Sequence, residues 1–175
     1  MKKRNMGNIL FIVPLPPPVH GSSLMCRQIQ QSEMINSTFD CTYVNLSTSR
    51  SNAEVNKFTP CLLIKKSIRF FKIYLNVFWH LLTHHPDIAY LSITCHGIGF
   101  LKDAPFVLLC KSFNCKIVLH QHNKGMKDYV HKPIYRWLLP FVYKNSTVIL
   151  LSWLLYDDIS LVVSRSQIRI CPNGI

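Results

Sequence analysis

Acidic residues are scarce in this sequence. Its 175 residues include 8 Asp and Glu against 20 Lys and Arg, a formal net charge of +12 with neutral His and a pI near 9.6. Such a balance favours an anionic partner: nucleic acid, an acidic membrane surface or a phosphorylated small molecule. No acid lies between Glu54 and Asp87, and no RNA- or DNA-binding motif is present. The interval between these two acids contains Lys57, Lys65, Lys66, Arg69 and Lys72.

Long hydrophobic runs are also missing. The apolar run 148–156 is far shorter than the ~18–20 residues that a membrane-spanning helix needs. The basic residues 2–4 precede an apolar run of only 9–13, and prolines follow at once, which is atypical of a signal peptide. Cysteines lack paired spacing, which indicates free thiols in a reducing compartment. We therefore expect a cytoplasmic protein, with peripheral contact at the inner face of the membrane.

Apolar residues make up 49% of the chain and charged residues 16%, which excludes a disordered polypeptide and suits one domain spanning 1–175. Short apolar runs predict strands at 8–13, 41–45, 88–93, 116–120, 147–151 and 168–171. Helical patterns lie between them at 22–34, 62–84, 101–113, 129–144 and 153–163. This alternation predicts an α/β fold with a Rossmann-like, doubly wound parallel sheet and helices on both faces. Ligands of such sheets bind at the carboxyl ends of the strands.

The loop after the first strand is rich in proline and leads into His20, Gly21 and Ser22. Gly21 allows close approach of a ligand to the backbone, and Ser22 is a plausible N-cap. The helix start that follows would suit a phosphate, although an ordinary capped loop has the same pattern. A P-loop is excluded, because no Gly-Lys-Ser/Thr follows.

Two further strand ends carry notable residues. Gly97-Ile98-Gly99 after the third strand is only a partial dinucleotide fingerprint, and we expect a flexible loop there. On the fourth strand the period of two places His120 and His122 on the same side. His122 could bind a sugar hydroxyl or a phosphate or act as a base, or be a satisfied polar residue at a strand end. A metal site is not expected, because the spacing matches no common zinc pattern; it would recruit Cys95, His96, Cys110, Cys115, His120 and His122.

The predicted helix 62–84 is amphipathic. Its cationic side suggests either a solvated face of a crossover helix packed on the sheet, or contact with anionic lipid or an anionic acceptor. The apolar side contains Ile64, Ile68, Phe71, Leu75, Phe78 or Trp79, and Leu82. The other side contains Lys65, Arg69, Lys72 and Asn76.

Several of these loops, taken in order, resemble the N-terminal domain of family 4 glycosyltransferases of the GT-B class. The pattern comprises the Pro-Pro-Pro-x-His-Gly loop ending at Gly21, His122 after a strand, the apolar run ending at Ser152, and Pro-Asn-Gly-Ile at 172–175. The resemblance covers nearly the whole chain. It implies the acceptor-side half of an enzyme that transfers a sugar from a nucleotide sugar to a saccharide or lipid-linked acceptor.

The resemblance also implies roles for individual residues. Gly21 and Ser22 would lie near the donor phosphates, and His122 would be the catalytic histidine beside the donor sugar. Asn173 and Gly174 would form the turn toward the interdomain hinge and help to bind the donor. His20, His96 and Lys124 are candidates on the acceptor side. No cofactor or metal is expected, and no Asp-x-Asp motif is present to hold one.

Two departures from the family pattern stand out. Trp153 follows Ser152 where the family usually has Glu, and the chain stops at Ile175 without the Glu-x7-Glu donor motif. We therefore expect the C-terminal donor-binding domain to be absent and the chain alone to be inactive. Its cleft face should be exposed and apolar, with Phe100, Met126 and Trp153. The alternative is a non-catalytic basic module that binds an anionic ligand, a membrane or a partner chain.

Overall fold

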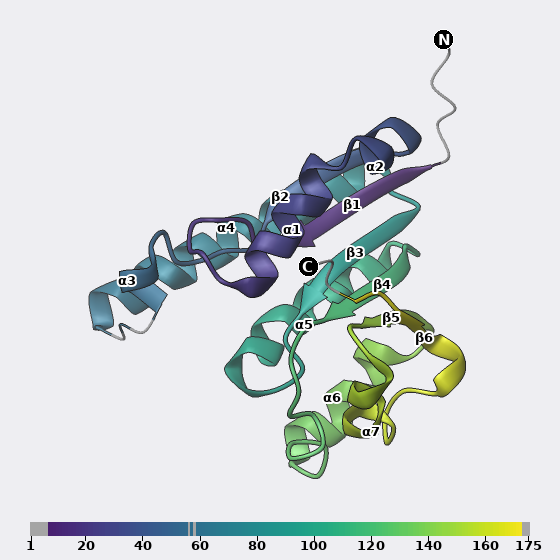
Figure 1. Ribbon diagram of the computed structural model, residues 1–175. Coiled ribbons are helices and arrows are strands. Elements are labelled where there is room, and N and C mark those ends of the chain that lie inside the picture. Colours follow the sequence, from purple (N-terminus) through teal and green to yellow (C-terminus); the bar gives the residue numbers. More distant parts are fainter. Residues whose placement is uncertain (1–6, 56, 58, 173–175) are drawn as a thin grey trace. The chain divides into compact units, whose positions relative to one another are not determined.

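The computed structural model describes residues 7–55, 57 and 59–172. Its sheet has six parallel strands in the order β2-β1-β3-β4-β5-β6 (Figure 1). This confirms the predicted α/β, Rossmann-like doubly wound fold. The chain divides into two compact units, Met1–Ala89 and Tyr90–Ile175, which are described separately.

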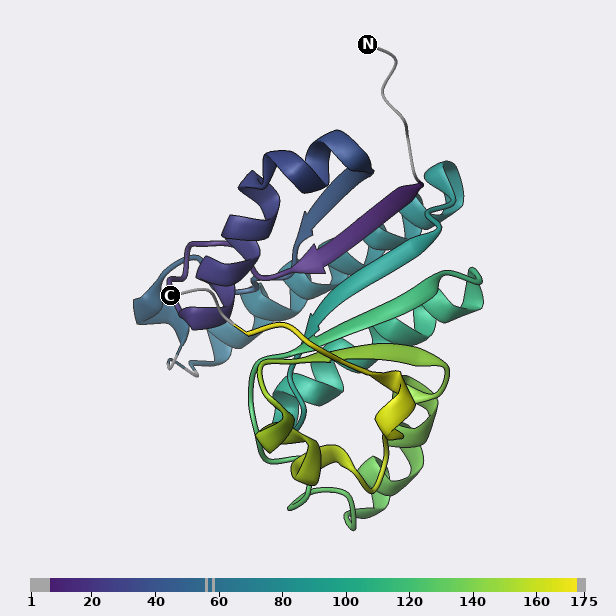
Figure 2. The same cartoon turned by 45° about the vertical axis from the view of Figure 1, so that its right-hand side comes forward.

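The first unit is built on a parallel pair of strands. β1 and β2 run in register from Asn8 opposite Asp40 to Val13 opposite Asn45. In Figures 1 and 2, α1 and α2 lie on one side of this pair and α4 on the other. The unit comprises β1 (Asn8–Val13), α1 (Gly21–Gln31), α2 (Glu33–Thr38), β2 (Asp40–Asn45), α3 (Asn52–Val55), α4 (Pro60–His84) and the start of β3 (Ile88–Ile93).

Capping residues set the helix ends in this unit. The single helix predicted at 22–34 is wrong, because Ser32 adopts an extended backbone and its hydroxyl accepts from the Ile35 amide, which starts α2. α4 begins at Pro60, whose missing N–H costs nothing in the first turn. It ends where His85 takes a left-handed φ of 44°.

The second unit continues the parallel pattern. β4 pairs with β5 and β5 with β6, each in parallel. Asn114 and Asn145, with φ of 61° and 55°, reverse the chain after α5 and α6, in the backbone region that Asn tolerates. The unit comprises the rest of β3, α5 (Gly97–Ser112), β4 (Lys116–Gln121), α6 (Pro133–Tyr143), β5 (Ser146–Leu150), η1 (Trp153–Leu155), α7 (Tyr156–Ile159), η2 (Arg165–Gln167) and β6 (Ile168–Ile170).

Three expectations for this unit need correction. Gly97–Gly99 is the first turn of α5 rather than a flexible loop, and a Cβ on Gly99 would lie 2.7 Å from Thr94 Cγ2. The helix predicted at 153–163 is only η1 and α7. Phe100 and Met126 are fully buried in the core instead of lining an exposed face, whereas Trp153 is 47% exposed.

α4 also differs from the simplest expectation. Val77 and Leu81, rather than the predicted apolar side, form its buried face, and the side that includes Phe71 and Leu75 is exposed. The described part of the chain contains no helix that is both long and apolar enough to cross a membrane.

Candidate functional site

Two histidines meet where β4 ends in the second unit. His120 lies within β4, and His122 follows the last strand residue, Gln121. Their ring centroids are 4.0 Å apart, so the predicted same-side placement is confirmed. The Tyr90 hydroxyl of β3 makes a short hydrogen bond with His120 Nδ1. The pair therefore presents His122 at the carboxyl end of the sheet, with His120 behind it.

Burial keeps His120 uncharged. Only 3% of this residue is exposed, and desolvation, with a smaller contribution from the neighbouring His122, lowers its pKa to about 3. Its Nε2 has no hydrogen-bond partner among the described residues. At neutral pH His120 is thus a neutral imidazole next to His122. Its Nε2 can accept or donate one hydrogen bond without adding charge to the site.

A buried hydrogen-bond chain fixes the backbone after β4. The Tyr143 hydroxyl donates to Gln121 Oε1 (3.0 Å), and Gln121 Nε2 donates to the Asn123 carbonyl (3.1 Å). The Cys95 amide then donates to Asn123 Oδ1 (3.3 Å), which joins the loop after β3 to the loop after β4. Gln121 and Tyr143 are fully buried, so this scaffold holds His122 from within the core. Sequence reasoning missed it, because both residues stand in runs that resemble ordinary core.

His96 lies against the same loop. It is the N-cap residue of α5, and its ring contacts Tyr129 edge-on at 5.3 Å. A Cβ on Gly125 would lie 2.7 Å from His96 Cδ2, so the ring occupies the space that a side chain at position 125 would need. His96 Nδ1 is buried and has no hydrogen-bond partner among the described residues. The structure therefore brings His96 and the segment carrying His122 and Lys124 together.

Asp158 of α7 anchors the far end of this loop. Its carboxylate accepts from the amides of Gly125 (2.9 Å), Met126 (3.0 Å) and Lys127 (3.3 Å). Three amide donors to one buried carboxylate hold the loop in place. Lys124, which precedes these residues, is exposed. The sequence alone did not single out Asp158, because two adjacent aspartates resemble surface charge. Only the structure shows that Asp157 is exposed and Asp158 is buried.

The loop before α1 is ordered by a reciprocal cap. His20, rather than Ser22, is the N-cap: its Nδ1 accepts from the Ser23 amide (3.3 Å), and Ser23 Oγ accepts from the His20 amide (3.0 Å). The Ser22 hydroxyl lies 3.0 Å from His20 Nδ1. Gly21 is exposed, and a Cβ built on it would meet no atom within 4 Å. The space beside Gly21 is thus open, whereas the Ser23 amide is already capped by the His20 ring.

The predicted site residues fall into two groups. His20, Gly21 and Ser22 belong to the first unit, and His96, His122 and Lys124 to the second. Each group is assembled within its own unit. Asn173 and Gly174 lie outside the described residues.

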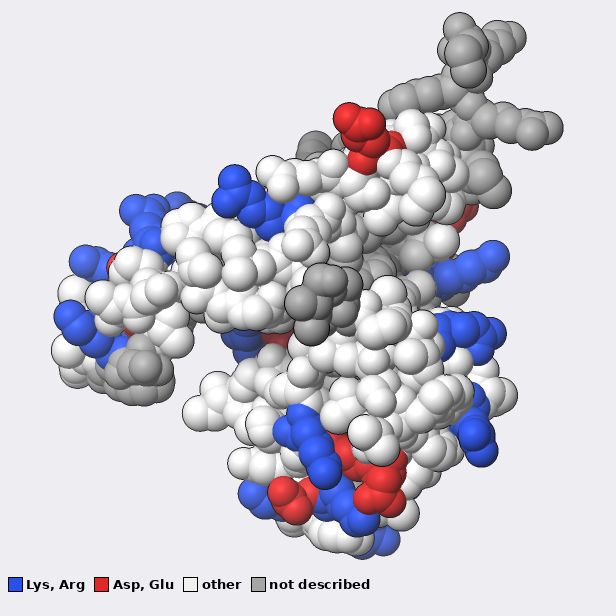
Figure 3. All heavy atoms as spheres, in the orientation of Figure 1, with Lys and Arg blue, Asp and Glu red and all other residues white. Residues whose placement is uncertain are grey.

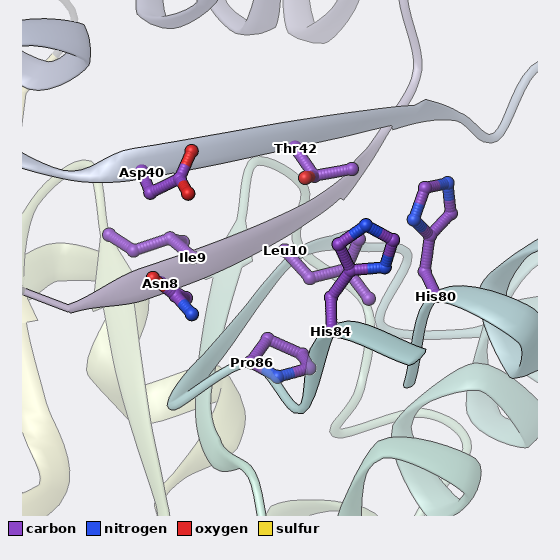
Figure 4. Close-up of a pocket in the computed structure, with 8 residues that line it drawn as sticks. All are labelled: Asn8, Ile9, Leu10, Asp40, Thr42, His80, His84 and Pro86. Atoms are coloured by element: carbon purple, nitrogen blue, oxygen red, sulfur yellow. The ribbon is translucent and has the colours of Figure 1, made fainter. Parts of the chain in front are cut away.

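A separate small pocket opens in the first unit (Figure 4). It has a volume of about 60 Å³ and lies toward the amino ends of β1 and β2, where no site was predicted. The His80 and His84 rings, 5.1 Å apart, approach it from α4. Burial and the nearby His84 lower the pKa of His80. The volume suits a few water molecules rather than a nucleotide sugar.

Metal-ligating side chains do not gather in the described residues. No group of three or more His, Cys, Asp or Glu there is arranged to hold a metal ion. Burial raises the pKa of Cys95 to about 12 and also raises that of Cys110, so both are thiols at neutral pH.

The fold and these loops define an α/β protein with polar residues at the carboxyl ends of its strands. No model of a known protein family, no curated protein and no solved structure matched this chain.

Proposed function

We propose that this chain is the acceptor-side half of a nucleotide-sugar-dependent glycosyltransferase of the GT-B class. The observation that carries the proposal is His122, which emerges at the carboxyl end of β4 with its ring against the neutral, buried His120. Side chains at this end of a parallel sheet meet ligands. The order of the Pro-rich loop, His122 and Pro-Asn-Gly-Ile supports the same class.

The transfer breaks the bond between the anomeric carbon and the diphosphate and forms a bond to an acceptor hydroxyl. His122 would contact the donor sugar or take the hydroxyl proton, and a neutral His120 behind it adds no repelling charge. The departing diphosphate needs positive potential, which helix N-termini and basic side chains supply. Gly21 and Ser22 in the first turn of α1 are candidates for the first of these, since a ligand could approach the backbone beside Gly21. The acceptor would be a saccharide or a lipid-linked saccharide, near His20, His96 and Lys124.

The test needs this chain together with a donor-binding domain, because in the proposed enzyme groups on both domains orient the substrates and stabilise charge. We would translate the reading frame beyond Ile175, or supply a donor-binding domain separately, and measure sugar transfer. His122→Ala should lower turnover about 10²-fold or more. His131→Ala, an exposed histidine of the same unit, is the matched control and should have no effect.

Normal turnover in a folded His122→Ala enzyme would refute the role of His122. Absence of transfer with every common nucleotide sugar, together with no Glu-x7-Glu segment downstream, would refute the class. A non-catalytic, anion-binding module would then be the better description.

A further inference from the structure

α4 has two apolar faces, and the first unit uses only one of them. Val77 and Leu81 have no exposed surface and anchor the helix in the core. A second row of large apolar side chains is 39–62% exposed. This row, called the α4 stripe below, consists of Ile64, Ile68, Phe71, Leu75, Phe78, Trp79 and Leu82.

The stripe is continuous along the helix. Its members recur every three or four residues, which places them within a sector of about 100° on one side of an α-helix. From Ile64 to Leu82 the stripe extends ~27 Å at the usual rise per residue. Leaving so many Phe, Trp and Leu side chains in water is unfavourable, and contiguous patches of this kind mark sites of association.

Basic residues flank the stripe at its amino-terminal half. Lys65 and Lys72 are exposed, and α4 contains neither Asp nor Glu. A groove of about 360 Å³ opens beside Ile68, lined also by Arg50, Lys65, Arg69 and Lys72. Figure 3 shows basic side chains around the end of the first unit where α3 lies. Glu54 forms an ion pair with Arg69 (2.8 Å), so the groove keeps an excess of positive charge.

We propose that the α4 stripe and this groove dock the protein on an anionic phospholipid surface. The helix lies parallel to the membrane, the stripe enters the boundary between headgroups and acyl chains, and the groove receives lipid phosphates. An apolar row containing Trp and Phe beside lysines is typical of helices that lie in this interface. The sequence predicted lipid contact through the cationic side of this helix. In the present proposal the exposed apolar row also enters the membrane. The inference goes beyond the proposed glycosyltransferase and does not depend on it.

A second copy of the chain fits the stripe less well. α4 has no acidic side chain to pair with Lys65 or Lys72 of another molecule. With Phe78 and Trp79 side by side the row is also wider than the narrow seam of a coiled coil. An anionic lipid surface satisfies both the apolar row and the lysines.

Co-sedimentation with vesicles tests the proposal directly. The 175-residue chain should bind vesicles of equal parts phosphatidylcholine and phosphatidylglycerol at least tenfold more tightly than phosphatidylcholine alone, and salt should weaken this binding. Phe71→Ser combined with Leu75→Ser should reduce binding about a hundredfold, since two large side chains no longer leave water. Lys65→Gln combined with Lys72→Gln should reduce it about twentyfold. Ile134→Ser combined with Phe141→Ser removes similar exposed apolar area from α6 and should change nothing.

Tryptophan fluorescence reports insertion. With Trp137→Phe and Trp153→Phe, Trp79 is the only indole left, and its emission should shift to the blue on vesicles and be quenched by brominated acyl chains. Vesicle binding with unchanged Trp79 emission would overturn insertion of the stripe. Equal binding by the Phe71→Ser, Leu75→Ser variant would do the same. A solution dimer that this variant abolishes, with no vesicle binding, would assign the stripe to a second copy. None of these results affects the test of His122, so the two proposals fail separately.

Discussion

At the scale of single residues, His120 and His122 show how two histidines two positions apart acquire different surroundings. His120 is enclosed between the Tyr90 hydroxyl and the His122 ring, and burial holds its pKa near 3. Burying this ring therefore costs less free energy when the ring is neutral than when it is protonated. Stability should consequently depend on pH.

We predict that the free energy of unfolding falls as pH drops below the ordinary histidine pKa of about 6.5. The unfolded chain then binds a proton that folded His120 excludes, and protons favour the state that binds them. The contribution is fully present above pH 7 and is lost progressively toward pH 3, with about 2 kcal/mol lost between pH 7 and pH 5. Urea unfolding at several pH values measures this slope.

His120→Asn is the control, because its amide oxygen can still meet the Tyr90 hydroxyl and does not titrate. The lowered pKa of His80 adds to the slope in both proteins, so the difference between them isolates His120. An identical slope in the variant would contradict the assignment of a neutral His120.

Gly125 and Gly21 form a second contrast at this scale. Gly125 has a φ of 128°, and a Cβ there would lie 2.7 Å from the His96 ring. We predict that Gly125→Ala costs about 1–3 kcal/mol in unfolding free energy, through backbone strain and displacement of His96. Gly21→Ala, at a helix start with open space, should be neutral or stabilise by up to about 1 kcal/mol. Equal effects of the two changes would contradict both the backbone strain at Gly125 and the cost of displacing His96.

At the scale of elements, the loop between β4 and α6 depends on α7, which follows it by some thirty residues. Asp158 is buried and accepts three amides of the loop, whereas Asp157 beside it forms an exposed ion pair with Lys127 (3.0 Å). The two neighbouring carboxylates therefore contribute differently to the structure. Asp158 holds the loop in place, whereas Asp157 contributes little to stability because solvent screens its ion pair.

We predict that Asp158→Ala lowers the free energy of unfolding by about 3 kcal/mol, since buried amides lose a charged acceptor. Asp157→Ala should cost at most about 1 kcal/mol. Urea denaturation compares the two, and hydrogen exchange of the Gly125–Lys127 amides should accelerate only in the first. Similar losses in both variants would mean that the loop does not rely on Asp158.

The boundaries of strands were easier to predict from the sequence than those of helices. The predicted strands agree with the observed ones to within a residue, because continuous apolar runs are required where both faces of a parallel sheet are buried. Helix ends were less predictable. His20 caps α1 with a ring nitrogen, and Ser32 ends one helix and starts the next, so each depends on geometry that composition does not reveal.

At the scale of the whole molecule, the glycosyltransferase proposal predicts weak binding by the chain alone. Most donor contacts would come from a second domain, so nucleotide sugars should bind with millimolar or weaker Kd, about 4 kcal/mol or less. Calorimetric titration with common nucleotide sugars measures this. Micromolar affinity, or sugar transfer by the 175 residues, would place a complete donor site within this chain.

The sequence by itself determined the fold class, the strands and the position of His122 at a strand end, because alternating buried runs and helical periods are local properties of the chain. Only the tertiary structure decided that His120 is neutral, that Asp158 holds the loop, that Phe100 and Met126 are core, and that the α4 stripe is exposed. These depend on contacts between residues distant in sequence and on which of two apolar helix faces meets the sheet. Periodicity marks a face as apolar but does not say what covers it.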